Sequence, residues 1–298
     1  MKKYLTLLLL FSTIVAFSQE GSDTTSAKGV DVGIAEISVP FVTQRDNYQS
    51  NIPTIELNIG NTMPKYKESV ISDNFTESNI IDVKIGFTDM FKVSGTDKIL
   101  EEDFNYIHIS RFDKLSNTDE AGPDLNVRAW QIGLGNLQGY GWRTGGNSSV
   151  TMYNASSMVW TNLNFEEEQI NSENSSAINV FDDRVRFGSK FEAGVKARLI
   201  DNIGIQVAYE RSHIFPHHKV WYWLGSEIVQ GIGNGLASVF IDAVKKSSPA
   251  LVPIVDFIFR NGISYGMYEL RSKKMNWPFN TVPPFEFESF KLGTTFYF

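Results

Sequence analysis

Apolar and polar residues alternate with a period of two through residues 187–213, and this pattern constrains the fold more than any other feature of the chain. Side chains on a β-strand point alternately to its two faces. We therefore predict one strand over Phe187–Leu199 and a second over Ile203–His213, joined by a tight turn at Asp201-Asn202. A soluble antiparallel sheet produces the same alternation, so the pattern alone does not identify a membrane protein.

Weaker alternation recurs along the chain and predicts an all-β protein. With the two strands above, the predicted strands number eight, and the other six are Val30–Phe41, Ile55–Ile59, Ile81–Phe87, Trp130–Leu134, Val150–Leu163 and Lys291–Phe298. Eight antiparallel strands in up-and-down order make a small transmembrane barrel. Phe104–Phe112 is a candidate ninth strand, and because such barrels have an even number of strands, ten is the alternative.

The N-terminus has the composition of an export signal. Lys2 and Lys3 precede an uncharged stretch, Tyr4–Phe17, which is shorter than the roughly 20 residues of a membrane-spanning helix. We expect residues 1–18 to be a cleaved signal peptide and residues 19–298 to form the barrel domain. The chain contains no cysteine, which excludes disulfide bonds and thiolate metal sites.

The region between the last two predicted strands, residues 215–284, has a helical period instead of a strand period. Apolar residues recur there at every fourth position, as in an amphipathic helix, at Leu224, Ile228, Ile232, Leu236, Phe240 and Val244. Pro249 and Pro253 can start a second helix that includes Phe257 and is apolar nearly all round. We predict a two-helix cap outside the cell that binds a partner protein through Leu224, Ile228, Ile232, Leu236, Phe240 and Phe257. Packing of the helices on each other and on the barrel mouth, or burial in the outer-leaflet interface, satisfies the same pattern.

The last eight residues, Lys291–Phe298, form an alternating strand that ends on an aromatic residue. This segment resembles the closing strand of bacterial outer-membrane β-barrels, in which a terminal Phe is read by the barrel-assembly machinery. The resemblance implies that Phe296 and Phe298 are an assembly signal and that the protein lies in the bacterial outer membrane. Together with the export signal and the helical insertion, it makes the chain similar to small outer-membrane barrel proteins of Bacteroidetes-type bacteria.

Strand direction follows from placing the C-terminus and the short turns in the periplasm. The insertion at residues 215–284 and the segment Lys92–Leu125 then lie outside the cell, while Asn61–Asn79 becomes a long periplasmic connection. In this arrangement the closing strand Lys291–Phe298 pairs with Val30–Phe41.

The polar faces of the predicted strands carry charges of both signs. They include Asp82, Lys84, Lys190, Glu192, Lys196, Arg198 and Glu210, accompanied by Glu56, Gln206 and Lys291. The interior of an eight-stranded barrel is just wide enough for side chains to fill it. We therefore expect opposite charges to pair and plug the lumen, because an unpaired buried charge would cost several kcal/mol. A conducting channel is the alternative.

No set of residues in the sequence makes a convincing catalytic, cofactor or metal site. Ser212 and His213 are neighbours on a predicted strand and point to opposite faces, so they cannot form a catalytic pair with each other. The formal net charge of −7 argues against nucleic-acid binding. We expect a non-enzymatic accessory or structural subunit of a larger outer-membrane assembly, secretion or uptake complex, in contact with outer-membrane lipids and other outer-membrane proteins. An enzyme that modifies lipid A or phospholipid, or a small pore, is the alternative.

Overall fold

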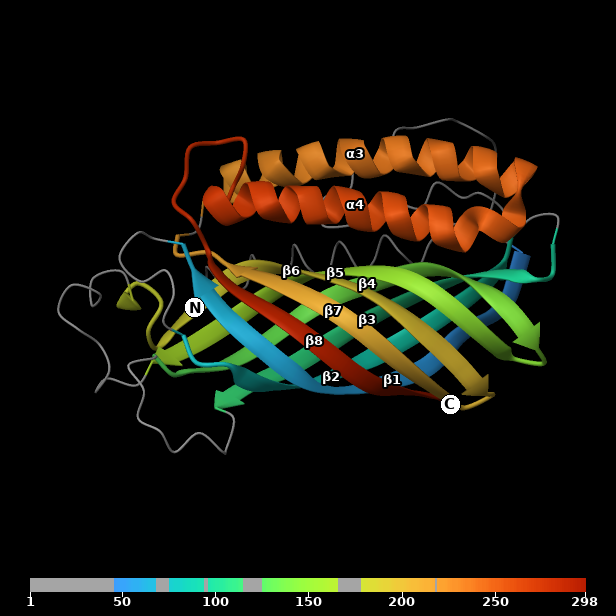
Figure 1. The fold of residues 1–298 in the computed structure, drawn as a ribbon, viewed down its shortest axis with the longest axis horizontal. Helices are drawn as coiled ribbons and strands as arrows, with labels where there is room; N and C mark the ends of the chain where they lie inside the picture. Colours follow the sequence, from blue (N-terminus) through green and yellow to red (C-terminus); the bar gives the residue numbers. More distant parts are fainter. Residues whose placement is uncertain (1–45, 68–74, 94–95, 115–124, 166–177, 218) are drawn as a thin grey trace, which may run out of the picture. The chain divides into compact units, whose positions relative to one another are not determined.

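A computed structural model describes residues 46–67, 75–93, 96–114, 125–165, 178–217 and 219–298. Eight antiparallel strands pair in chain order, and the last pairs with the first, so the sheet closes into a barrel (Figure 1). The strands are β1 (Asp46–Tyr66), β2 (Ser78–Lys92), β3 (Ile99–Lys114), β4 (Val127–Gly145), β5 (Ser148–Phe165), β6 (Arg184–Ile200), β7 (Ile203–Ile214) and β8 (Phe285–Tyr297). The predicted eight-stranded, up-and-down antiparallel barrel with a helical insertion before its last strand is confirmed.

The closing strand has a different partner from the predicted one. β8 pairs with β1, where Leu292 lies opposite Ile59, and the prediction that Val30–Phe41 closes the barrel is therefore wrong. Val30–Phe41 lies outside the described residues. The candidate ninth strand, Phe104–Phe112, is part of β3 and completes the eight. Three consecutive acidic residues early in β3, from Glu101 to Asp103, obscured its alternation in the sequence.

The short and the long connections between strands lie at opposite ends of the barrel. Tight turns join Gly145 to Ser148 and Ile200 to Ile203, and the β2–β3 connection lies at the same end. The longer connections, including the helical insertion, lie at the other end. Two predicted connections are therefore wrong: β3 divides Lys92–Leu125, and Asn61–Tyr66 belongs to β1, with the β1–β2 connection at the long-loop end.

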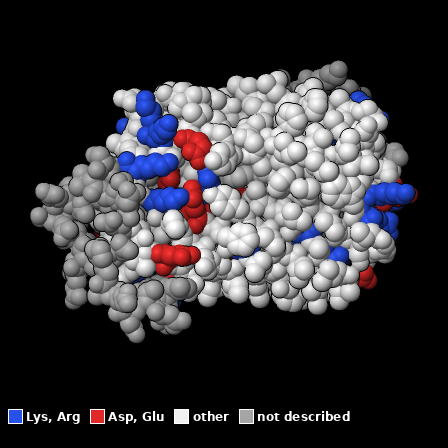
Figure 2. Space-filling model, in the orientation of Figure 1, with Lys and Arg blue, Asp and Glu red and all other residues white. Residues whose placement is uncertain are grey.

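The barrel is polar inside and apolar outside. Outward residues such as Ile59, Ile85 and Phe290 are more than half exposed, whereas the inward charged residues are buried. On the face drawn in Figure 2, charged residues gather toward the two ends of the barrel and leave a broad band between them largely free of charge. This distribution is the reverse of a soluble protein and is typical of barrels that span a membrane.

The insertion folds into a helical hairpin that lies along the outer wall of the barrel (Figure 1). It consists of α3 (Val220–Ser247), a short 3₁₀ turn (Pro249–Leu251) and α4 (Val252–Lys273). The hairpin packs on β4, β5 and β6, so it lies against the side of the barrel, and its position outside the cell stays a prediction. Among the described residues, no helix combines the length and apolarity of a membrane-spanning helix.

Candidate functional site: the interior charge network

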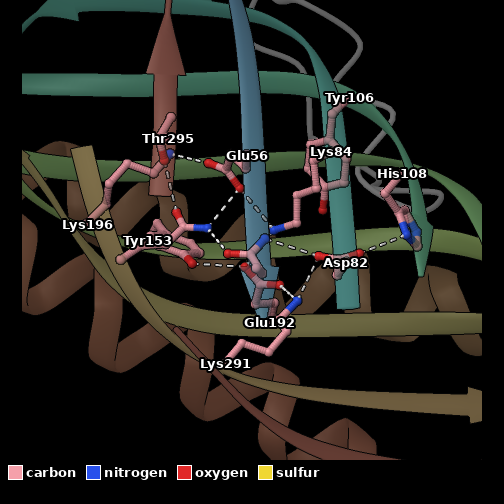
Figure 3. Close-up of polar contacts among 12 residues, drawn as sticks. Glu56, Asp82, Lys84, Tyr106, His108, Tyr153, Glu192, Lys196, Lys291 and Thr295 are labelled. Atoms are coloured by element: carbon pink, nitrogen blue, oxygen red, sulfur yellow. Dashed lines mark hydrogen bonds and ion pairs between the residues drawn. The ribbon is translucent and has the colours of Figure 1, made fainter. Parts of the chain in front are cut away.

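Lysine and carboxylate side chains from opposite strands meet in the middle of the barrel (Figure 3). The Nζ atom of Lys84, on β2, lies 2.7 Å from Oε1 of Glu192 on β6. Because β2 and β6 lie four places apart in a ring of eight strands, this ion pair crosses the lumen. Lys84 also lies 3.3 Å from Glu56 Oε2 on β1.

Lys291, on the closing strand, occupies the centre of a carboxylate cluster. Its Nζ atom lies 3.1 Å from Asp82 Oδ2, 2.6 Å from Glu192 Oε2 and 2.5 Å from Glu210 Oε2. Those three acids have ligand atoms within 4.8 Å of one another, which is the spacing of a cation site. The ammonium group of Lys291 supplies positive charge at this place, so the geometry favours an internal salt bridge over metal binding.

The network continues along the barrel through two more lysines. Lys196 Nζ lies 2.7 Å from Glu56 Oε1 and 2.9 Å from Glu102 Oε1. Lys190 Nζ lies 3.2 Å from Glu210 Oε2 and 3.6 Å from Asp82 Oδ1. Each of the four lysines in the network therefore contacts at least two carboxylates, which offsets the desolvation of its buried charge.

Aromatic side chains close the lumen at the long-loop end, beyond the ion pairs. The rings of Phe112 and Phe287 stack with centroids 4.3 Å apart, and Phe285 packs against Phe287, Phe165 and Phe181. All are buried within one apolar cluster. The interior thus has two successive seals, one of charged side chains and one of aromatic rings.

The charged residues singled out in the sequence divide into two groups. Asp82, Lys84, Lys190, Glu192, Lys196 and Glu210 all lie in the network. Arg198 is also buried but lies nearer the short-turn end, where it donates hydrogen bonds to the Asp201 carbonyl and Gln49 Oε1.

Several members of the network were not identified from the sequence. Glu102 and His108 come from β3, and Tyr153 comes from β5, where its hydroxyl donates to Glu192 Oε1 at 2.9 Å. The usable signal was the period-two series of Glu102, Phe104, Tyr106 and His108, whose side chains all point inward. Leaving β3 as a doubtful strand concealed that signal.

The hairpin residues proposed to bind a partner do not share one environment. Ile228, Ile232, Leu236 and Phe240 are exposed, whereas Leu224 and Phe257 are half-buried. Phe240 packs against Phe259 of α4, with ring centroids 5.0 Å apart.

The two aromatic residues assigned to the assembly signal lie at the end of the closing strand. Phe296 lies opposite Ile55 of β1 and Ile203 of β7 and is half-buried. Phe298 is exposed, and its backbone N–H donates to the Pro53 carbonyl at 3.0 Å.

The described residues hold no Ser–His catalytic pair at His213. Ser212 points into the barrel, where its hydroxyl accepts a hydrogen bond from Gln131. His213 points outward beneath α4; its ring stacks on Tyr268 with a 4.0 Å centroid separation, and Nε2 lies 3.2 Å from Glu286 Oε1. No serine hydroxyl contacts its imidazole in the described part of the chain.

Comparisons with known proteins give only distant structural likenesses. No family model matches the sequence, and no curated protein matches it significantly. Neisserial surface protein A (NspA) matches with a TM-score of 0.35 and 8% identity over 83% of this chain and 97% of its own. Ail, the attachment invasion locus protein of Yersinia pestis, matches with a TM-score of 0.34 and 8% identity over 84% of this chain and 100% of its own. The fold assignment rests on the strand pairing itself.

Proposed function

We propose that this protein is a non-conducting, non-enzymatic β-barrel of the bacterial outer membrane that serves as an accessory or structural subunit of a larger assembly, secretion or uptake complex. The observation that carries the proposal is the filled interior. Lys84, Glu192 and Lys291 bridge the lumen, and aromatic rings close its long-loop end. A barrel sealed in this way offers partners its outer wall and its loops rather than a passage.

The outer-membrane location is supported by the inverted polarity of the barrel and agrees with the export signal predicted from the sequence. Outward Ile, Leu and Phe side chains would face lipid, and the paired charges would be shielded from it by the sheet. With the lumen occupied, the pore alternative has no continuous polar path. With His213 paired to Glu286 and stacked on Tyr268, the lipid-modifying alternative has no serine nucleophile at this histidine among the described residues.

Conductance tests the sealed lumen directly. Purified full-length protein in planar lipid bilayers is expected to give no stepwise single-channel current. A known porin inserted in the same membrane serves as the control for detection. Reproducible current steps from the folded, heat-resistant barrel would overturn the non-conducting assignment.

Copurification tests the accessory role. The protein should be isolated in mild detergent from its native outer membrane together with other outer-membrane proteins. A variant with Ile228→Ser, Ile232→Ser and Phe240→Ser tests the partner-binding stripe predicted from the sequence: loss of the partner from a folded barrel would place that partner on the stripe, and retention would place it on another part of the wall or on the loops. Asp242→Ser with Lys246→Ser, on the same helix and also exposed, is the matched control. Purification of the unaltered protein alone, with no associated protein, would contradict the role.

A further inference from the structure

We propose that the helical hairpin α3–α4 lies within the lipid bilayer beside the barrel, with lipid acyl chains covering its exposed face. The inference rests on the membrane location proposed above and concerns where the hairpin lies relative to the lipid. It replaces a cap outside the cell with an element that shares the apolar belt of the barrel.

The hairpin runs along the barrel wall from the long-loop end toward the short-turn end. Near the base of the hairpin, Tyr268 stacks on His213, which lies at the long-loop end of β7. At its bend, the carbonyl of Ala250 accepts a hydrogen bond of 2.9 Å from Trp142 Nε1, close to the β4–β5 turn. A hairpin that follows the wall between these two points passes alongside the apolar belt.

The polarity of α3 is inverted relative to a surface helix of a soluble protein. Its side buried against the protein includes Ser226, Glu227 and Asn234. Between Val220 and Ile241, every exposed residue is apolar or aromatic: Val220, Trp221, Tyr222, Ile228, Ile232, Leu236, Val239 and Phe240. A soluble helix places its apolar stripe on the core and its polar side in solvent. The reverse arrangement indicates an apolar solvent.

The second helix has the same inversion. Its buried residues include Asp256, Ser264, Arg271 and Ser272. From Ile254 to Leu270, the exposed residues are Ile254, Ile258, Phe259, Gly262, Tyr265, Gly266 and Leu270. None of them carries a charge.

The buried charges of the hairpin are paired and turned away from this face. Glu227 on α3 lies 3.0 Å from Arg271 on α4, and both are buried. Asp256 and Arg260, one helical turn apart, lie 2.7 Å from each other. Exposed charges such as Asp242 and Lys246 lie near the bend. The helix from Val220 to Ile241 is about 33 Å long, close to the thickness of the hydrocarbon core, so these charges would lie at the membrane–water interface.

The barrel wall beneath the hairpin complements these polar faces. Residues that point outward beneath the hairpin include Asn154, Ser156 and Ser189. Outward residues on the part of the wall that the hairpin leaves uncovered are often Ile, Leu or Phe. Ser156 and Ser189 line a cavity of about 50 Å³ that Glu227 and Arg271 line from the opposite side. The wall beneath the hairpin therefore offers these polar residues to the helices beside an apolar contact near the bend, where Tyr140 and Trp142 pack against Ile241 and Val252.

Lipid fits the exposed face better than a soluble partner because this face continues the apolar belt. The band in Figure 2 that is largely free of charge extends over both the barrel wall and the helices. The two helices supply polar partners to each other, as in the Glu227–Arg271 pair and the hydrogen bond from Arg260 to Ser238 Oγ, so neither helix has to be apolar all round. A partner protein would have to meet this face from within the membrane.

The absence of cysteine allows a spin label to be placed at single positions. The full chain, purified and inserted into nanodiscs that contain only phospholipid, would carry a nitroxide at Leu236→Cys or Ile258→Cys. The measurement is the collision rate of the nitroxide with oxygen, which concentrates in lipid, and with a water-soluble nickel chelate. Ile85→Cys on the barrel belt is the lipid control, and Lys246→Cys near the hairpin bend is the water control.

The expected result is an oxygen-to-nickel ratio at Leu236→Cys and Ile258→Cys that matches Ile85→Cys and is several-fold above Lys246→Cys. A ratio equal to that of Lys246→Cys, with Ile85→Cys still in lipid, would overturn the hairpin inference alone. Low collision rates with both reagents would also overturn it, by indicating protein contact such as a second copy of the chain. A water-like ratio at Ile85→Cys would instead overturn the membrane location on which the inference rests.

Discussion

Lys291 Nζ lies 2.6 Å from Glu192 Oε2, and this contact joins the closing strand β8 to β6 across the intervening strand β7. The same ammonium lies 3.1 Å from Asp82 on β2, across the intervening strand β1. Lys291 therefore links the closing strand β8 to β2 and β6, the strands that lie beyond its two neighbours in the sheet. The backbone hydrogen bonds of β8, by contrast, join it only to β1 and β7.

Removing this lysine is expected to destabilise the barrel strongly. Lys291→Met should lower the free energy of unfolding by about 3–5 kcal/mol, because three carboxylates would remain buried without their shared cation. Urea-induced unfolding in detergent micelles or lipid vesicles measures the change. Lys65→Met is the matched control: its 2.6 Å pair with Glu288 is partly exposed, and its loss should cost about 0–1 kcal/mol. Equal effects of the two substitutions would contradict the proposed importance of the interior network.

The close approach of Tyr153 to Gly194 gives a second prediction. A Cβ atom on Gly194 would lie 2.5 Å from the Tyr153 ring, so Gly194→Val should overpack the lumen and destabilise the barrel by about 1–3 kcal/mol. Gly262→Ala, on α4 with open space around it, is the control and should be neutral or stabilising. Both are measured by the temperature at which the barrel loses its compact mobility on a gel. Adding Tyr153→Leu to Gly194→Val should recover part of the loss, and failure of that rescue would count against a steric cause.

Alternation in the sequence was sufficient to predict the barrel and the side of each strand on which a charge lies. Lys190, Glu192 and Lys196 share a face because residues two apart on a strand must do so. The same period could not determine which carboxylate each lysine contacts, since that depends on pairing across the ring. Lys84 and Glu192 are 108 residues apart in the chain and meet only when the sheet closes.

Prediction from the sequence was least complete at β1 and in the hairpin. β1 extends over Asp46–Tyr66, but its clear alternation is confined to a few residues near Ile55–Ile59, so its role in closure was assigned to Val30–Phe41. The apolar period of α3 correctly indicated a helix with two unlike faces. It could not indicate which face is buried, because the rule learned from soluble proteins places the apolar face inside.

The buried pair inside the hairpin gives a third prediction. Arg271→Met should leave Glu227 without its cation and loosen α3 from α4, while the barrel stays folded. Hydrogen exchange followed by mass spectrometry should detect faster exchange in the hairpin and little change in the strands. Lys273→Met, an exposed position on the same helix, should leave exchange unchanged.

A second substitution distinguishes loss of the ion pair from loss of packing. Arg271→Met combined with Glu227→Met removes both charges, and replacing a buried pair with apolar groups is often close to neutral. The double variant should therefore exchange more slowly than Arg271→Met alone. Exchange at least as fast as in the single variant would mean that the salt bridge does not hold the hairpin together.

The two-layered seal of the lumen gives the last prediction. Phe287→Ala removes one ring of the stacked pair with Phe112 and should cost about 3–5 kcal/mol through the cavity it leaves. It should nevertheless give no ion current in planar bilayers, because Lys84, Glu192 and Lys291 still bridge the lumen below the aromatic layer. The variant must first show the compact gel mobility of a folded barrel, so that the absence of ion current cannot be due to unfolding. Stepwise current from the folded variant would mean that the aromatic layer alone seals the barrel and that the ion pairs leave a path for ions.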